Sequence, residues 1–434
     1  MYACHFFLDF DMSDTLLTRL NRAAKLNQPE QGIVLIDRRR NEQHYTWKSI
    51  NTRSLQMAHI LAEKGIQFND RVAIILPTCI EFMDGFFGCQ QLGAIPVPLY
   101  PPLRLGKLDE YFKRTIAMLQ AANICAVITN NQISRILGQL VADYPLRCGL
   151  IKVEGLSYQA EFNPISIDSD HLAMAQFSSG TTNAPKPVGL THRQVLSNTD
   201  AILQYVTVYG DVGCSWLPLY HDMGLIGCIF PAVSLPGKLA LIPPQVFLAK
   251  PAIWLQSISK HRAVVSPAPN FAYAYCAQRV KDSDMLDVDL SAWKLALNGA
   301  EAVAPEHLRL FNERFSPFGL NENTMTPVYG LAEASLAVTF SDPSRPFSSI
   351  TFQRESLLAG RAIAGDEVEL TTVGTPLPGF SVDIRDGTGK SLDEGYIGKI
   401  HVRGPSVMKG YLNDTPSPIV NGWLDTGDIG FLYK

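Results

Sequence analysis

Short apolar runs alternate with helical segments between about residues 33 and 330, and this alternation constrains the fold more than any other feature. The runs RVAIILP, ICAVITN, LAMAQFSS, AVVSPAP and WKLALNG are typical of strands buried in parallel sheets. The segments SINTRSLQMAHILAEKG and VAPEHLRLFNERF have helical character, and Gly65 fits the position just after a helix. The pattern predicts a layered α/β fold with largely parallel sheets, in which ligands bind at the carboxyl ends of the strands.

The pattern changes after about residue 365, where side chains alternate with a period of two in EVELTTVG, FSVDIRDGTGKSLDEGYIGKIHVRG and GWLDTGDIGFLYK. Asp386 and Gly387 form a turn signal within this part of the chain. These features predict a smaller β-rich subdomain over about residues 366–430, packed on an α/β body that extends to about residue 340. Residues 341–367 fit neither pattern and are interpreted as an insertion.

The composition excludes several classes of function. The chain of 434 residues has 46% hydrophobic and 18% charged residues, as is ordinary for a globular protein with a large core. A net charge of −4 gives no support to nucleic-acid binding. The eight cysteines show no C-x-x-C pair and no zinc spacing, which indicates a reduced, cytoplasmic protein. The most apolar window, GLIGCIFPAVSLPGKLALIPP, is broken by prolines and Lys238, so no membrane span is expected.

The stretch QFSSGTTNAPKPVGLTH, residues 176–192, combines small hydroxyl side chains, glycines and one lysine between apolar flanks. Glycine permits a close backbone approach, serine and threonine donate hydrogen bonds, and lysine supplies positive charge, so a phosphate group is the first candidate ligand. The spacing is not that of a Walker A loop. The alternative is a flexible polar turn between a strand and a helix.

The stretch WLPLYHDMGLIG, residues 216–227, places His221 and Asp222 at a predicted strand-to-helix turn. One interpretation is that these two residues belong to a functional site at this turn. The other is that Asp222 caps a helix and that His221 is a loop histidine with a satisfied hydrogen bond.

The stretches LNGAEAVAPEH and TPVYGLAEASLAV each place a glycine and a carboxylate, Glu301 or Glu333, after a predicted strand. Tyr329 precedes the second glycine, a position that suits stacking on a purine. Glu301 alone is equally well explained as an acid in the first turn of a helix. In GWLDTGDIG, Asp428 is suited either to accept hydrogen bonds from a ribose diol or to close a β-turn.

Taken together, the stretches FSSGTTNAPK, PLYHDMGLIG, VYGLAEA and DTGD resemble the adenylate-forming superfamily of acyl-CoA synthetases, firefly-luciferase-like enzymes and nonribosomal adenylation domains. Within it, the chain is most similar to fatty acyl-AMP ligases. The motifs occur in family order from about residue 13 onward. The resemblance implies that residues 13–434 are the AMP-binding N-terminal domain, with two layered α/β subdomains and a smaller β-barrel-like one.

The resemblance implies nucleotide-binding roles for the residues that match the motifs. The ATP phosphates would be wrapped by Ser178, Ser179, Gly180, Thr181, Thr182 and Lys186. The adenine would be bordered by Asn298, Gly299, Ala300 and Glu301, with Tyr329 against its face and Gly330 allowing close approach. Asp428 would accept hydrogen bonds from the ribose hydroxyls.

The remaining implied roles concern the metal, the acyl substrate and the chemistry. Glu333 would hold Mg²⁺, a hard ion that prefers carboxylate, phosphate and water oxygens. The acyl carboxylate would lie near His221, Asp222, Met223 and Gly224. The catalytic residues would be His221, Lys186 and Glu333.

Two positions depart from the family pattern. Pro187 stands where the family usually has glycine after the loop lysine, and Ala332 stands where it usually has threonine, a change that fatty acyl-AMP ligases often share. The sequence ends at GFLYK, about where the family has its hinge. The resemblance therefore implies a further C-terminal lid domain with a second catalytic lysine that this chain does not contain, so low activity is expected of the chain as given.

The implied reaction is attack of a fatty carboxylate on the α-phosphorus of ATP, which releases pyrophosphate and leaves an acyl adenylate for transfer to an acyl carrier protein. An apolar run, MGLIGCIFPAVSLPG, follows Asp222 and is expected to wall a tunnel for a medium or long chain. One alternative is an acyl-CoA synthetase, which the family-type insertion at 341–367 disfavours. The other alternative is a non-catalytic module that binds nucleotide and acyl groups.

Overall fold

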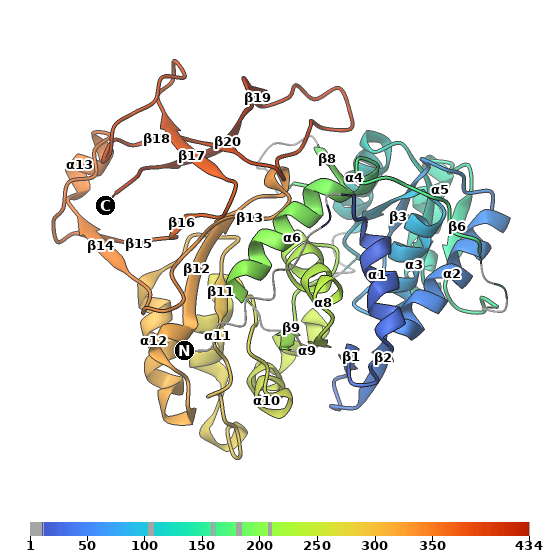
Figure 1. Ribbon diagram of the computed structural model, residues 1–434, viewed down its shortest axis with the longest axis horizontal. Helices are drawn as coiled ribbons and strands as arrows, with labels where there is room; N and C mark the ends of the chain where they lie inside the picture. Colours follow the sequence, from blue (N-terminus) through green and yellow to red (C-terminus); the bar gives the residue numbers. More distant parts are fainter. Residues whose placement is uncertain are drawn as a thin grey trace.

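Two sheets with parallel strands form the first part of the molecule, as the apolar runs predict (Figure 1). The computed structural model describes residues 11, 13–102, 108–157, 160, 162–178, 185–206 and 211–433. The first sheet is parallel throughout, with the order β4(Ile95–Pro98), β3(Arg71–Ile74), β5(Ile124–Thr129), β6(Gly149–Lys152). The second has the order β2(Glu42–Thr46), β1(Gly32–Ile36), β10(Lys238–Leu241), β9(Val212–Ser215), in which only the β1–β2 pair is antiparallel.

The third sheet has the order β11(Ala296–Asn298), β12(Met325–Gly330), β13(Ala337–Phe340), β16(Thr375–Pro376). Strands β11 and β12 are parallel, whereas β12–β13 and β13–β16 are antiparallel. The run AVVSPAP, expected to be a strand, makes only isolated bridges, in which Val265 links Gly213 to Leu295. It thereby connects the second sheet to the third.

Helices cover these sheets, and side chains cap the start of some of them. The helices are α1(Leu16–Leu26), α2(Trp47–Glu63), α3(Ile80–Gln91), α4(Leu108–Ala121), α5(Asn131–Asp143), α6(His192–Val206), α7(Asp222–Gly224), α8(Phe230–Ser234), α9(Pro244–Ala249), α10(Ala252–His261), α11(Asn270–Arg279), α12(Pro305–Phe315) and α13(Arg354–Leu358). Thr46 caps α2 by accepting a hydrogen bond from Ser49 N at 3.1 Å. Gly65 follows α2 with φ +84°, which confirms the predicted helix end.

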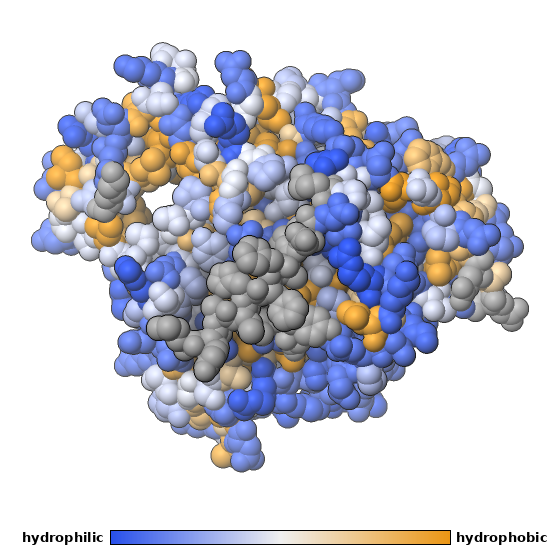
Figure 2. Space-filling model, viewed as in Figure 1, coloured by the Kyte–Doolittle hydropathy of each residue, from blue (hydrophilic) through white to orange (hydrophobic). Residues whose placement is uncertain are grey.

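The last part of the chain is antiparallel, as its period-two pattern predicts. A four-stranded sheet has the order β17(Ser381–Arg385), β18(Gly398–Arg403), β20(Trp423–Gly430), β19(Ile419–Val420). The separate pair β14(Ser349–Phe352) and β15(Val368–Thr371) lies beside it. Figure 2 shows hydrophobic side chains exposed around the opening between these two parts, on a face that is otherwise largely hydrophilic.

Two large hydrophobic clusters hold the α/β part together. One contains Phe86, Phe87 and Phe230 between the first sheet, α3 and α8. The other is built on Trp254 and Phe311, whose rings belong to α10 and α12. Within the described residues, no helix is both long and apolar enough to cross a membrane.

Candidate functional site

The stretch 176–192 forms a hairpin whose two strands lead toward the predicted phosphate loop. Strand β7(Leu172–Phe177) pairs antiparallel with β8(Pro187–Thr191), and β8 continues directly into α6. Ser178 N donates a 3.3 Å hydrogen bond to Lys186 O, so these two predicted phosphate ligands face each other where the strands end. The predicted ligands Ser179, Gly180, Thr181 and Thr182 lie outside the described residues.

Lys186 and Glu333, predicted as catalytic residues, are brought to the same side chain, Tyr411. The Lys186 ammonium lies 5.7 Å from the centre of the Tyr411 ring, within the range of cation–π attraction. The Tyr411 hydroxyl donates a 3.0 Å hydrogen bond to Glu333 Oε1. Burial, with a contribution from the Glu333 charge, raises the pKa of the Tyr411 phenol, so the hydroxyl keeps its proton and acts as the donor. Tyr411 is a site residue that sequence reasoning missed.

Glu333 sits on a tight turn that fixes where its side chain begins. The turn comprises the short 3₁₀ helix Ala332–Ala334 and Ser335, which has φ +70°. Gly330 precedes it, and a Cβ at Gly330 would lie 1.8 Å from Leu336 O, so only glycine allows this close approach. The glycine predicted to permit ligand approach thus also permits the turn that carries Glu333.

Tyr329 and Asp428, predicted to contact adenine and ribose, are brought into direct contact. Tyr329 lies next to the last residue of β12 and Asp428 lies on β20, and the phenol donates a 2.7 Å hydrogen bond to Asp428 Oδ2. Burial raises the pKa of the Tyr329 phenol, and the hydrogen bond with Asp428 adds to this effect. The alternative that Asp428 only closes a turn is therefore insufficient, because its carboxylate bonds a residue on another sheet.

The predicted adenine border follows β11, beside the end of β12. Asn298 is fully buried and donates from Nδ2 to Asn270 Oδ1 at 3.2 Å, while Gly299 packs against Val328. Ala300 lies next to them in the left-handed region, with φ +68°.

Glu301 makes a contact that neither interpretation anticipated. Its Oε1 accepts a 2.7 Å hydrogen bond from Phe271 N in the first turn of α11. Because α12 begins only at Pro305, Glu301 is not an acid of that helix's first turn, and this alternative is wrong. The carboxylate instead ties the predicted adenine border to the start of α11.

His221 and Asp222 lie at the start of α7, as the turn prediction placed them. His221 Nδ1 lies 2.5 Å from Asp222 Oδ1, and the Asp222 charge raises the pKa of His221. Asp222 Oδ1 also accepts a 2.7 Å hydrogen bond from Met223 N. Gln176 on β7 donates to Tyr220 O at 3.0 Å, which joins this turn to the hairpin. Gly224 follows, where a Cβ would lie 2.2 Å from Pro218 O.

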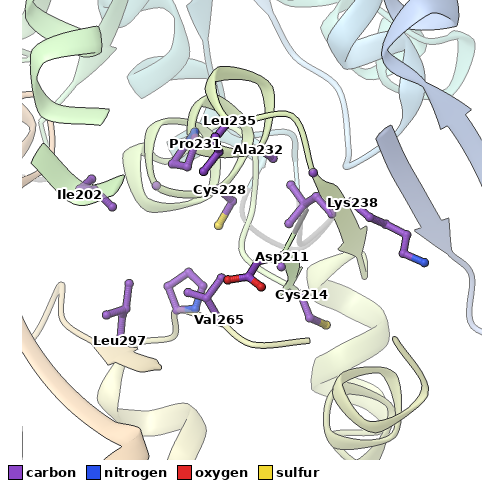
Figure 3. A pocket seen from close by; sticks show the side chains of 15 residues that line it. Ile202, Asp211, Cys214, Cys228, Pro231, Ala232, Leu235, Lys238, Val265 and Leu297 are labelled. Atoms are coloured by element: carbon purple, nitrogen blue, oxygen red, sulfur yellow. The ribbon is translucent and has the colours of Figure 1, made fainter. Parts of the chain in front are cut away.

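A cavity of about 50 Å³ lies behind the helical run that follows His221 (Figure 3). The run continues from α7 through the π-helix η2(Leu225–Ile229) into α8. It contributes Gly227, Cys228, Pro231, Ala232 and Leu235 to the cavity wall, opposite Val265 and Leu297. Figure 3 shows the Cys228 sulfur pointing into the cavity and the Lys238 side chain pointing away from it. Burial raises the pKa of the Cys228 thiol to about 12, so it behaves as a small apolar group.

The predicted magnesium site involves a single carboxylate of the described residues, that of Glu333. The described ranges contain no group of three or more His, Cys, Asp or Glu side chains that could hold a metal ion. Mg²⁺ usually binds through one or two carboxylates together with phosphate and water oxygens. Glu333, the predicted magnesium ligand, has such a carboxylate, and its Oε1 lies 3.0 Å from the Tyr411 hydroxyl.

Comparisons with known proteins agree with this arrangement. The profile of the AMP-binding enzyme family matches residues 22–412. A 4-hydroxyphenylalkanoate adenylyltransferase of Mycobacterium tuberculosis is 33% identical over 429 residues, which cover 90% of this chain and 67% of the relative. A medium-chain fatty-acid–acyl-carrier-protein ligase of Moorena producens is 29% identical over 415 residues, covering 89% of this chain and 69% of that protein.

Solved structures show the same likeness. The fatty acyl-adenylate ligase from Legionella pneumophila, in complex with acyl adenylate and pyrophosphate, superposes with a TM-score of 0.88 at 28% identity. The superposition covers 97% of this chain and 75% of the Legionella chain. The predicted α/β class with a smaller β-rich part is therefore confirmed.

Proposed function

Since the chain belongs to the AMP-binding enzyme family and is an adenylate-forming ligase, we propose that it activates a medium- or long-chain fatty acid as acyl-AMP for an acyl carrier protein. The observation that carries this proposal is the convergence of Lys186, Tyr411 and Glu333 at the end of the β7–β8 hairpin. It puts a positive charge and a carboxylate beside the loop assigned to the phosphates.

In the proposed reaction a carboxylate oxygen of the fatty acid attacks the α-phosphorus of ATP. The new P–O bond forms the acyl adenylate, and the bond to the β-phosphate oxygen breaks to release pyrophosphate. Lys186 and Ser178 would bind phosphate oxygens, and His221, with its raised pKa, would lie toward the acyl carboxylate. Such phosphoryl chemistry depends on positioning and on neutralising charge, and it needs no protein nucleophile.

Tyr329, Asp428 and the residues after β11 would bind the nucleoside. Strands β11 and β12, which lead to the predicted adenine border and to Tyr329, run parallel, so the loops that follow them open at the same edge of the sheet. Mg²⁺, when bound by Glu333 with the nucleotide, would neutralise phosphate charge. These assignments are supported by the geometry and by the family, and they are tested by the variants described below.

The cavity next to Cys228 supports a fatty acid as the substrate. Its wall comes from the run that also carries His221, so a chain whose carboxylate lies at His221 would extend toward Cys228 and Pro231. Apart from Asp211 and Lys238, the side chains that line the cavity are apolar, so an apolar acyl chain would lie mostly among apolar groups. The Moorena relative acts on medium-chain fatty acids, by its name, which favours the same substrate class.

Two observations favour a carrier protein over CoA as the acceptor. The Moorena relative is named a ligase for acyl carrier protein. In addition, the segment 341–367, predicted as an insertion, contributes strand β14, whose Phe352 ring lies 5.2 Å from that of Phe431 and 5.1 Å from that of Tyr433. The segment is thus packed against residues that follow the end of β20.

The first experiment is ATP–pyrophosphate exchange with a series of fatty acids, alongside nucleotide titration. Exchange is measured with the chain as given and with a version extended through the implied lid domain. Exchange that requires a fatty acid supports adenylation, whereas nucleotide binding without exchange in both versions supports the non-catalytic module. The second experiment supplies CoA or a phosphopantetheine-bearing carrier protein to the acyl adenylate. Phe352→Ala is expected to increase transfer to CoA, and efficient CoA transfer by the unaltered chain would favour the acyl-CoA synthetase instead.

A further inference from the structure

One segment, residues 404–413, contacts Glu333 at both its backbone and its side chain. Met408 N donates a 2.8 Å hydrogen bond to Glu333 O, and the Tyr411 hydroxyl donates to Glu333 Oε1 at 3.0 Å. A carboxylate on a surface turn ordinarily samples several rotamers. Because one segment bonds both the backbone carbonyl and the carboxylate of Glu333, this side chain has a defined position before any ligand arrives.

The same segment is fastened to the hairpin that carries Lys186. Leu412 N donates a 2.8 Å hydrogen bond to Pro187 O, and Asn413 Nδ2 donates to Pro185 O at 3.2 Å. Tyr411 itself forms a β-bridge with Val188. The chain on both sides of Lys186 is therefore bonded to the two residues that follow Tyr411.

A third set of bonds fixes the segment from behind. On α6, Gln194 Nε2 donates to Val407 O at 2.6 Å, and the buried Asn198 donates to Ser406 Oγ at 3.0 Å. Ser406 Oγ in turn donates to Ala334 O, next to Glu333, at 2.7 Å. Because these bonds are buried or partly buried and support one another, the segment is a rigid support, and Tyr411 is the side chain that it extends toward the site.

We propose that Tyr411 is a positioning residue that sets the separation of Glu333 and Lys186 for binding ATP with its divalent cation. The hydroxyl orients the carboxylate, and the ring face attracts the ammonium, so one side chain holds an anion and a cation that would otherwise pair directly with each other. A direct Lys186–Glu333 ion pair would remove both charges from the ligand. This inference rests on the proposed function, because it assigns the two charges to the nucleotide and its metal.

The test compares Tyr411→Phe, which keeps the ring and removes the hydroxyl, with Tyr411→Leu, which removes both. Tyr275→Phe is the matched control, because its hydroxyl donates to a backbone carbonyl, Leu248 O, on α9. Calorimetric titration measures the affinity for ATP with and without Mg²⁺. A thermal unfolding midpoint checks that each variant is folded, and exchange kinetics give KM and kcat separately.

Tyr411→Phe is expected to weaken ATP binding about tenfold in Mg²⁺, the effect of losing one hydrogen bond to a charged group, and to leave binding without Mg²⁺ nearly unchanged. Its KM for ATP should rise more than its kcat falls. Tyr411→Leu is expected to weaken binding under both conditions, since Lys186 also loses its partner. Tyr275→Phe should match the unaltered chain.

Tyr411→Phe with unaltered affinity in Mg²⁺ would overturn the proposal. So would an equal loss with and without Mg²⁺, because that result indicates a general structural role. Nucleotide binding without fatty-acid-dependent exchange would contradict the proposed reaction while leaving the binding test of Tyr411 valid. A folded chain that binds no nucleotide would overturn both.

Discussion

Tyr329 Oη lies 2.7 Å from Asp428 Oδ2, and this hydrogen bond joins β12 of the third sheet to β20 of the C-terminal sheet across 99 residues of sequence. The raised pKa of the phenol keeps its proton in place, so the carboxylate receives a donor at any pH near neutrality. Asp428 is thereby held beside the ring assigned to the adenine. A ribose attached to that base would lie within reach of the same carboxylate.

Asp428→Ala is therefore expected to weaken ATP binding by about 10- to 100-fold, because a hydrogen bond to a charged group contributes about 1.5–3 kcal/mol. The KM for the fatty acid should change little. Tyr329→Phe, which leaves the carboxylate in place, should have a smaller effect. Asp366→Ala, at an exposed position, is the control for removal of a surface charge. Equal KM values for ATP in the Asp428 and Asp366 variants would contradict the ribose assignment.

Lys186→Ala is expected to weaken ATP more than the fatty acid and to reduce the adenylation rate. An ammonium that stabilises developing phosphate charge contributes several kcal/mol to catalysis, with about tenfold in rate for each 1.4 kcal/mol. The comparison is Lys260→Ala on α10, whose ammonium pairs with Glu42 at 2.7 Å. Exchange assays at varied ATP and fixed fatty acid measure the effect. If the two lysine variants behave alike, Lys186 does not bind the phosphates.

The sequence predicted the parts of the fold that depend on local periodicity. The parallel strands β3 and β5, the end of α2 at Gly65 and the antiparallel C-terminal sheet all follow from apolar spacing or turn residues. The prediction that LAMAQFSS lies in a parallel sheet is wrong, because β7 pairs antiparallel with β8, and a run as apolar as this one fits either kind of sheet.

The site residues were harder to predict wherever a contact spans distant elements. Tyr411 bonds Glu333 from 78 positions away, and no local pattern marks a tyrosine that does so. Glu301 was expected either to lie in the first turn of a helix or to border the adenine. Its carboxylate instead accepts a hydrogen bond from Phe271 N in α11, 30 positions earlier. Motif spacing identifies a residue's type and place in the chain, but its hydrogen-bond partner depends on how the sheets pack.

Acid is expected to destabilise the fold through His192, which is fully buried on α6. Its Nδ1 accepts a 3.0 Å hydrogen bond from Leu16 N, and burial lowers its pKa from 6.5 to about 3. The neighbouring ring of His171, 6.5 Å away, also has a lowered pKa. Between pH 6.5 and about pH 3, His192 binds a proton in the unfolded chain but not in the folded chain. The contribution of the buried neutral His192 to stability is therefore fully present above pH 6.5 and is lost as the pH falls toward 3.

The His192 contribution should decrease by about 2 kcal/mol between pH 7 and pH 5. Urea unfolding at the two pH values measures the free energy of unfolding directly. His192→Asn retains an acceptor for Leu16 N without a titrating group, so its stability should depend less on pH by about that amount. His44→Asn, at an exposed site on β2, should leave the dependence unchanged. An identical dependence in the unaltered chain and the His192 variant would contradict the argument.

The last prediction concerns the length of the acyl chain. If the cavity beside Cys228 receives the substrate, affinity should increase by about 0.8 kcal/mol, or roughly fourfold, for each added methylene until the chain reaches the end of the cavity. Cys228→Phe fills the cavity from its η2 wall, so it should lower the affinity for the longest acids and leave the shortest acids almost unaffected. Cys228→Ala, which removes the sulfur and adds no volume, is the matched control and should not shorten the preferred chain. Exchange assays from acetate to laurate and beyond give KM for each acid, and ATP binding checks that the nucleotide site is intact. Affinities that stay flat from acetate to laurate, or a Cys228→Phe variant that weakens all acids equally, would show that the chain lies elsewhere.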